Sequence, residues 1–345
     1  MLSAASPRAA LALLSLCLAT ACGSESPAQK AEPSFSYPLD GVLRLNHLQV
    51  KGTHNSYHLK PQEQAIIPWN YSHLPLDEQF LTQGVRAVEL DVSYSAALGH
   101  LEVFHIAGLD ELTTCRVFVD CLTTLEHWSA AHPAHHPIFI QIEVKDAVEG
   151  AELDALLATI ETEILSVWSL ERLVTPDLVK AEAPTLREAL TTTGWPTLGA
   201  LRGRALFFFD NEGTLTAQYT LGNQTLDGKV LFVPSSPQDP YAAVAKLNDP
   251  IADAVAIGEA LAAGMIVRTR ADADSLEPST GDATRREAAL SSGAQIVSTD
   301  YPAPGSAYDY YVEIPDGTPT RCNPVTAPDA CTSPSIENPA FMSPQ

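Results

Sequence analysis

The sequence predicts an α/β fold, a (β/α)₈ TIM barrel with a C-terminal extension. Short runs rich in β-branched and aromatic residues alternate with segments of helical periodicity. Eight such runs are present, and eight parallel strands with intervening helices close into a barrel. Polar residues also collect directly after several runs, where a barrel of this type carries its active site. These three observations agree on one architecture.

The eight predicted strands cover residues 48–53, 85–92, 101–105, 138–144, 205–210, 230–234, 264–269 and 295–299. Leucine and isoleucine recur at helical spacing most clearly over Glu149–Trp168, and shorter helical patterns cover Ala252–Ala263 and Thr284–Ser291. The link between the second and third predicted strands is too short for a helix. The barrel is therefore predicted to be irregular around these two strands.

The N-terminal residues predict export. Arg8 precedes an apolar run over residues 9–19 that is too short to span a bilayer, so residues 1–21 are typical of a signal peptide. Cys22 stands where a bacterial lipoprotein signal carries its acylated cysteine, so the exported protein is predicted to be either secreted or lipid-anchored to the cell envelope. We expect a disordered tether over 22–40, the barrel over 41–302 and the extension over 303–345.

Composition and charge narrow the partners. The chain has 345 residues, of which 45% are apolar and 18% charged, which is typical of a globular protein with a large core. The formal charge of −22 argues against a nucleic-acid partner and favours cations. No protein partner is implied. The four cysteines that follow Cys22 form two short-range candidate disulfides, Cys115 with Cys121 and Cys322 with Cys331, and their spacing is unlike that of zinc sites.

Four residues offer oxygen ligands for a hard cation: Asn55, Glu89, Asp91 and Glu143. One amide and three carboxylate oxygens form the ligand set that Ca²⁺ prefers, and Mg²⁺ is the second candidate. Glu89 and Asp91 alternate with Val88 and Leu90, so the alternative of a solvated edge strand is less favoured, because acids in an apolar run need a cation.

Further polar residues at predicted strand ends suggest roles in catalysis. His54 and His105 lie beside the acid pair and can move a proton near neutral pH, whereas the other histidines are structural by default or unassigned. The candidate substrate-binding residues are Lys145, Arg268 and Arg270. A core ion pair of Lys145 with Glu143, and pairing of the arginines with nearby aspartates, are the structural alternatives. Asp300 either orients His54 from the neighbouring strand or caps a loop.

In this order, His54-Asn55, Glu89-x-Asp91, His105 and Glu143 resemble the Ca²⁺-dependent phosphatidylinositol-specific phospholipase C family of bacteria. The likeness runs from about Val50 to Pro302. It implies cleavage of an inositol phospholipid or a glycosylated anchor at a membrane surface, giving diacylglycerol and an inositol cyclic phosphate. His105 is then the acid for the leaving oxygen, and His54 either takes the hydroxyl proton or donates to the phosphoryl oxygen. Only Lys145 represents the lysines that eukaryotic relatives use for extra ring phosphates.

Two other functions stay open from the sequence. A glycerophosphodiester phosphodiesterase uses a similar barrel, a Glu-x-Asp pair and two histidines, but it normally opens with His-Arg, where this chain has His54-Asn55. The other alternative is an inactive surface protein that binds lipids or glycans through the same pocket. Retention of both histidines and all four oxygen ligands argues against it.

Overall fold

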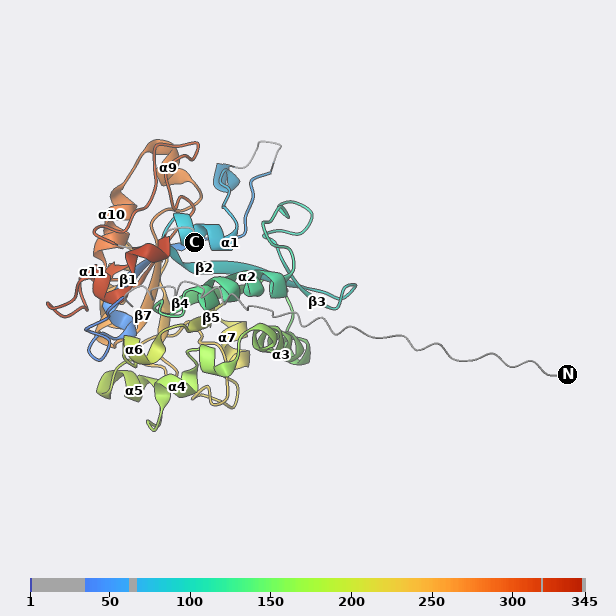
Figure 1. Cartoon of the computed structure of the whole chain (residues 1–345), viewed down its shortest axis with the longest axis horizontal. Helices are drawn as coiled ribbons and strands as arrows, with labels where there is room; N and C mark the ends of the chain where they lie inside the picture. The colour runs from blue at the N-terminus through green and yellow to red at the C-terminus, as the bar shows by residue number, and fades with distance from the viewer. Residues whose placement is uncertain (2–34, 62–66, 318, 343–345) are drawn as a thin grey trace. The chain divides into compact units, whose positions relative to one another are not determined.

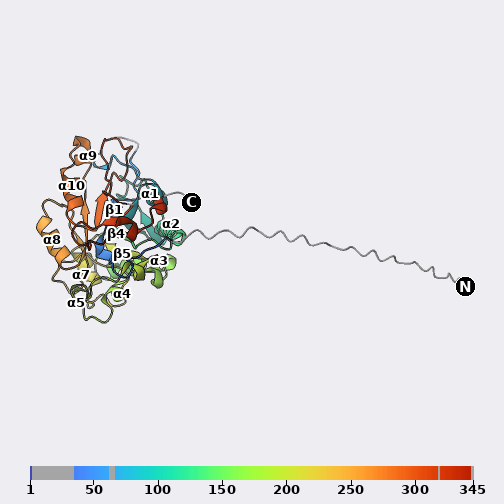
Figure 2. The ribbon, with the colours of Figure 1, turned by 60° about the vertical axis from the view of Figure 1, so that its left-hand side comes forward.

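Seven parallel strands form the framework that positions the site, and helices surround them (Figures 1 and 2). The computed structural model describes residues 1, 35–61, 67–317 and 319–342, and Ser36–Gln345 form one unit. The parallel strands are β1 (Leu48–Thr53), β2 (Val85–Ser95), β4 (Ile138–Val144), β5 (Ala205–Phe209), β6 (Val244–Lys246), β7 (Ile266–Arg270) and β8 (Ile296–Thr299). Their order across the sheet is β5-β4-β2-β1-β8-β7-β6.

The sheet curls into a nearly closed barrel, which confirms the predicted fold class. The predicted strand over 230–234 is present only as two isolated parallel bridges, Phe208 with Phe232 and Pro234 with Val244. These bridges connect the two edge strands, β5 and β6, across the remaining gap. Because β6 has only three residues, no run of β-forming residues revealed it in the sequence.

The predicted barrel strand over 101–105 is wrong in direction. Strand β3 (His100–Val103) pairs antiparallel with the second half of β2, so it forms a hairpin above the barrel and is not part of its wall. The crossover helix α2 (Phe118–Ala131) follows this hairpin and leads into β4. A hairpin thus occupies the link that was too short for a helix, which explains the predicted irregularity.

The helices that link or flank the strands follow the predicted pattern. Those with predicted counterparts are α3 (Gly150–Val167), α8 (Ala254–Ala262) and α10 (Thr284–Ser291). The others are α1 (Leu76–Thr82), α4 (Pro176–Lys180), α5 (Leu186–Thr192), α6 (Leu198–Leu201), α7 (Thr214–Tyr219), α9 (Leu276–Thr280) and α11 (Ser333–Ile336). Short 3₁₀ helices cover η1 (Leu45–His47), η2 (Ile67–Trp69), η3 (Leu170–Arg172) and η4 (Pro339–Met342). Among the described residues, no helix has the length and apolarity to cross a membrane.

Strand β1 fits between β2 and β8 because residue 52 is glycine. A Cβ at Gly52 would lie 3.1 Å from the Cβ of Ala87 and 3.2 Å from a methyl group of Ile296. The register between β1 and β2 also shifts at this point. The small residue therefore allows the close approach that delivers the end of β1 to the mouth of the barrel.

The C-terminal extension begins beside the mouth of the barrel, where Tyr310 bonds to the Ala271 carbonyl, and its later part packs against the opposite end. Strand β9 (Arg321–Cys322) pairs antiparallel with the start of β1, and η4 packs against α1. Within this end, Arg86 Nε donates to Glu337 Oε2 at 2.7 Å, with both side chains fully buried. Removal of one partner of such a buried pair strongly destabilises the folded protein, because it leaves the other charge buried and unpaired. The later part of the extension therefore covers the end of the barrel opposite the mouth, which we call the barrel floor.

The N-terminal predictions lie mostly outside the described residues. These include the signal peptide, the acylation of Cys22 and the tether up to residue 34. Within the described end of the predicted tether, the Arg202 guanidinium stacks 3.5 Å from the Tyr37 ring centroid and pairs with Asp40 at 2.6 Å.

His136 makes the barrel floor sensitive to acid. Its ring is fully buried and bonds to Thr320 Oγ1 at 2.8 Å. Burial lowers the pKa of His136 to about 3, with the Arg86 charge acting in the same direction. The unfolded chain binds this proton at higher pH than the folded chain, so stability is complete above the ordinary histidine pKa and is lost as pH falls.

We expect wild-type protein to lose about 2 kcal/mol more unfolding free energy between pH 7 and pH 5 than the His136→Gln variant. Urea unfolding at pH 7 and pH 5 measures the loss for each protein. A further measurement at pH 8, where His136 is neutral in both the folded and the unfolded chain, gives the reference unfolding free energy of each protein. Equal losses for the two proteins would contradict the assignment.

Candidate active site

The polar residues predicted from the sequence converge at one end of the barrel because the parallel strands run in one direction. His54 and Asn55 follow β1, Glu89 and Asp91 lie within β2, and Glu143 lies near the end of β4. Strand β2 continues past the barrel wall into the hairpin, so its two acids are not at its end. Asn55 adopts a left-handed backbone conformation with φ 42°, which forms the tight turn after β1.

Three carboxylates form the centre of the site. Ligand oxygens of Glu89, Asp91 and Glu143 all lie within 4.8 Å of one another, and Asp91 is in register with Glu143 on the adjacent strand. Burial raises the pKa of Glu89 to about 7, although the Arg268 charge opposes this effect. Burial and the neighbouring Glu143 carboxylate raise the pKa of Asp91 well above its usual value. The cluster therefore concentrates negative charge where the side chains are shielded from solvent.

The donor set fits a hard divalent cation. Among the described residues, Asn55 Oδ1 and both carboxylate oxygens of Asp91 are buried without a hydrogen bond of good geometry. Lys145 Nζ supplies one positive charge, 3.1 Å from Asp91 Oδ2 and 3.0 Å from Glu143 Oε1. Burial opposes that charge, but the two carboxylates outweigh burial and raise the pKa of Lys145. Arg268, which lies 2.6 Å from Glu89, supplies a second positive charge. Two cations do not balance three carboxylates, so the site retains capacity for a cation.

His54 and Asp300 form a pair on one side of the acids. His54 Nδ1 lies 2.8 Å from Asp300 Oδ1, and His54 Nε2 lies 3.4 Å from a guanidinium nitrogen of Arg270. Burial lowers the pKa of His54 to about 3, and the Arg270 charge acts in the same direction. Asp300 thus has the placement that lets it orient His54, from β8 to the neighbouring β1.

His105 and Asp110 form a second pair on the hairpin side. His105 Nδ1 lies 2.8 Å from Asp110 Oδ2, and the His105 side chain is 17% exposed. His58 Nε2 reaches the same Asp110 oxygen at 2.9 Å. Burial raises the pKa of Asp110, but the two histidine hydrogen bonds outweigh burial and lower it to about 2. Asp110 is therefore an ionised carboxylate between two imidazoles.

The two predicted arginines differ in placement. Arg268 is buried, with Nη2 2.6 Å from Glu89 Oε2 and Nη1 bonded to Asn248. It is 1% exposed and braces an acid of the cluster, and its predicted contact with substrate stays a prediction. Arg270 instead reaches the mouth beside His54 and Asp300, at 3.2 Å from Asp300 Oδ2.

The sequence analysis missed three residues of this site. Asp110 and Tyr71 were not singled out, and His58 was left unassigned. The Tyr71 hydroxyl accepts a hydrogen bond from Asn55 Nδ2 at 3.2 Å and lies 3.5 Å from His54 Nδ1. These residues lie on irregular segments, and only His58, in the motif that contains His54, gave a signal that could have been followed.

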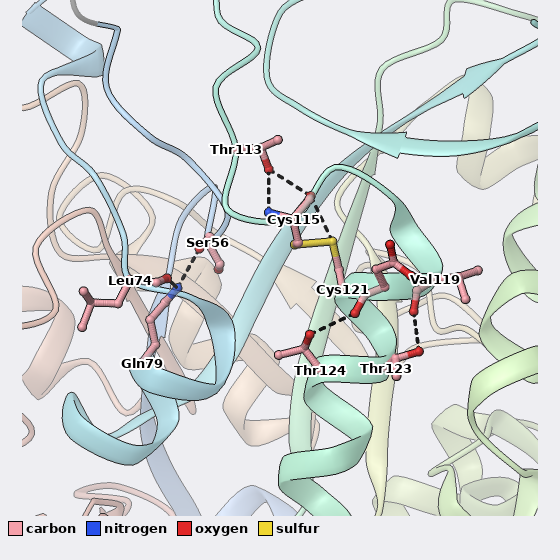
Figure 3. Close-up of a disulfide and its surroundings, with 10 residues drawn as sticks. Ser56, Leu74, Gln79, Thr113, Cys115, Val119, Cys121, Thr123 and Thr124 are labelled. Atoms are coloured by element: carbon pink, nitrogen blue, oxygen red, sulfur yellow. Dashed lines mark hydrogen bonds between the residues drawn. A yellow bond between two sulfur atoms is a disulfide. The ribbon is translucent and has the colours of Figure 1, made fainter. Parts of the chain in front are cut away.

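Both predicted disulfides are confirmed. Cys115–Cys121 joins the end of the loop that carries His105 and Asp110 to the first turn of α2 (Figure 3). Thr113 lies beside it and accepts a hydrogen bond from the Cys115 backbone. Cys322–Cys331 closes a loop in the C-terminal extension. Two disulfides fit a protein of an oxidising, extracytoplasmic compartment.

An acidic cluster flanked by two histidine–aspartate pairs at the mouth of an α/β barrel defines a phosphodiester-cleaving enzyme. The model of the family described as phosphoinositide phospholipase C, Ca²⁺-dependent, matches residues 43–102 and 95–324. The chain therefore belongs to the Ca²⁺-dependent phosphoinositide phospholipase C family. No curated protein matches it.

Solved structures agree with the fold. A calcium-dependent phosphoinositol-specific phospholipase C from Pseudomonas sp., in a myoinositol complex, is 20% identical and superposes with a TM-score of 0.60, covering 85% of this chain and 100% of that one. A Ca²⁺-dependent phosphatidylinositol-specific phospholipase C from Streptomyces antibioticus is 18% identical with a TM-score of 0.55, covering 75% and 95%. At these identities the likeness establishes the fold alone.

Proposed function

We propose that this protein is a calcium-dependent phospholipase C that cleaves phosphatidylinositol-type lipids into diacylglycerol and an inositol cyclic phosphate. The observation that carries the proposal is the cluster of three carboxylates beside the unbonded Oδ1 of Asn55, set between two histidine–aspartate pairs. The family match supports the phospholipid substrate class. Both free phosphatidylinositol and a glycosylated anchor satisfy this chemistry.

Asn55, Glu89, Asp91 and Glu143 are the proposed calcium ligands. Their oxygens match a hard cation, and the family match favours calcium over magnesium. When bound, calcium would lower the pKa of the attacking inositol 2-hydroxyl and balance charge on a phosphoryl oxygen. Arg268 holds Glu89 in place through their 2.6 Å contact.

His54 is the proposed base for the inositol hydroxyl. Arg270 can only donate to His54 Nε2, and Asp300 can only accept from Nδ1, so the neutral ring keeps its proton on Nδ1 and a lone pair on Nε2. Its depressed pKa keeps Nε2 unprotonated at neutral pH, and the inositol hydroxyl would replace the long 3.4 Å contact of Nε2 with Arg270. Asp300 then stabilises the imidazolium that forms after proton uptake.

His105 is the proposed acid for the diacylglycerol oxygen. Asp110 accepts a hydrogen bond from His105 Nδ1. The other ring nitrogen, Nε2, therefore points away from Asp110 and is the proposed proton donor. Arg270 at the mouth and Lys145 beside the carboxylates are the proposed contacts to phosphate or inositol oxygens. For location, the two disulfides support export, and Cys22 is the proposed lipid attachment point.

The proposed function, the rival phosphodiesterase and the inactive binder predict different results when the protein is assayed with two substrates. We expect purified protein to cleave phosphatidylinositol in the presence of Ca²⁺, to stop on addition of a chelator, and to leave glycerophosphocholine intact. Phosphorus NMR should show a five-membered cyclic phosphodiester as the first product. Cleavage of glycerophosphocholine alone would identify the rival enzyme, and no calcium-dependent turnover of either compound would contradict the proposed activity.

Acid and ligand roles should separate by mutation. His105→Ala should lower turnover roughly a hundredfold or more with calcium affinity nearly unchanged, because His105 lies outside the carboxylate cluster. Asp91→Asn should weaken calcium binding in a titration calorimeter, and the exposed Asp120→Asn on α2 is the matched control. A parallel loss of calcium affinity in His105→Ala would show that the two roles are wrongly divided.

A further inference from the structure

His58 is a buried histidine to which the proposed chemistry gives no role. It lies in the segment after β1 and is fully buried. Its Nδ1 lies 3.1 Å from the carbonyl oxygen of Tyr71, and its Nε2 lies 2.9 Å and 3.1 Å from the two oxygens of Asp110. A carbonyl and an ionised carboxylate can only accept hydrogen bonds. Both ring nitrogens of His58 therefore face acceptors, and Nε2 is the donor to Asp110.

Asp110 is shared between His58 and His105. Its Oδ2 atom accepts from both histidines, at 2.8 Å from His105 Nδ1 and 2.9 Å from His58 Nε2. Asp110 is 1% exposed, so its negative charge needs a permanent partner. If His105 were the only partner, that charge would be left uncompensated each time His105 gave up a proton. The Nε2 donor of His58 remains beside Asp110 throughout.

The backbone around this chain of side chains is also fixed. Asp110 and Ile106 exchange both backbone hydrogen bonds, which closes a tight turn between His105 and Asp110. Leu59 N bonds to Leu112 O at 3.2 Å, and Thr114 N bonds to Tyr57 O at 2.8 Å. The segment that carries His58 is therefore paired with the loop that carries Asp110, and the Cys115–Cys121 disulfide ends this loop.

We propose that His58 is a positioning residue for the leaving-group acid: it holds Asp110 so that Asp110 fixes the orientation and the Nδ1–H tautomer of His105. The inference rests on the proposed role of His105 as the acid. His58 touches neither substrate nor the carboxylate cluster in this arrangement. Its link to His105 runs through Asp110, and its contact with the Tyr71 carbonyl holds its own ring in place.

A comparison of two substrates tests this role. A diester with an alcohol leaving group, such as phosphatidylinositol, needs the acid, whereas an inositol phosphodiester with an acidic phenol leaving group does not. His58→Phe should slow the first substrate about tenfold or more and the second by less than about threefold. The double variant His58→Phe/Asp110→Asn should be no slower than Asp110→Asn alone, because the two residues act as one unit.

A second readout does not depend on turnover. In metal-free protein labelled with ¹⁵N-histidine, NMR should show His105 protonated on Nδ1, and this preference should be lost in Asp110→Asn and reduced in His58→Phe. His58→Gln, which retains one donor, should lie between wild type and His58→Phe and covers the case in which His58→Phe does not fold. His135→Gln, which alters a buried histidine at the other end of the barrel, should leave both the substrate ratio and the His105 tautomer unchanged.

Equal slowing of both substrates by His58→Phe, or an unchanged His105 tautomer in the folded His58 variants, would overturn the proposal. If wild-type protein cleaves neither substrate, the proposed function fails. The tautomer measurement then still decides whether His58 positions His105.

Discussion

Mutual repulsion among three carboxylates at the mouth of the barrel is the constraint on which the rest of the site depends. Glu89, Asp91 and Glu143 approach within 4.8 Å because β2 and β4 pair in a register that places Asp91 beside Glu143. The strands themselves are held by an apolar core, so the acids cannot separate. Arg268 and Lys145 offset part of this charge, and a bound cation is the simplest way to offset the remainder.

The two histidines are set apart by their environments. His54 is held neutral by burial and by the nearby guanidinium of Arg270. His105 shares an ionised aspartate with a second imidazole and is partly open to solvent. One ring is thus suited to accept a proton and the other to donate one, which is the division of labour that cleavage of a phosphodiester requires. The hairpin, the loop closed by Cys115–Cys121 and the C-terminal extension serve to keep these groups in place.

The centre of the site was predictable from the sequence because its signals are local. Two acids alternating with Val88 and Leu90 mark a strand whose polar side needs a cation, and His54-Asn55 directly follows the predicted strand over 48–53. The roles of Asp110, His58 and Tyr71 were not predictable, because they arise from contacts between irregular segments far apart in the chain. Strand β6 was too short to detect, and local pattern did not indicate that β3 would turn back on β2. The contact of Arg268 with Glu89 was not predictable either, because it joins β7 to β2 across the barrel and local sequence does not indicate which residues meet there.

The most direct test of the central claim is a crystal structure of the protein grown with calcium. The account predicts one ion bound by oxygens of Asn55, Glu89, Asp91 and Glu143, with the Lys145 ammonium moved away from Asp91 and Glu143. A mouth without a bound ion, with Lys145 still bridging the two carboxylates at saturating calcium, would contradict it.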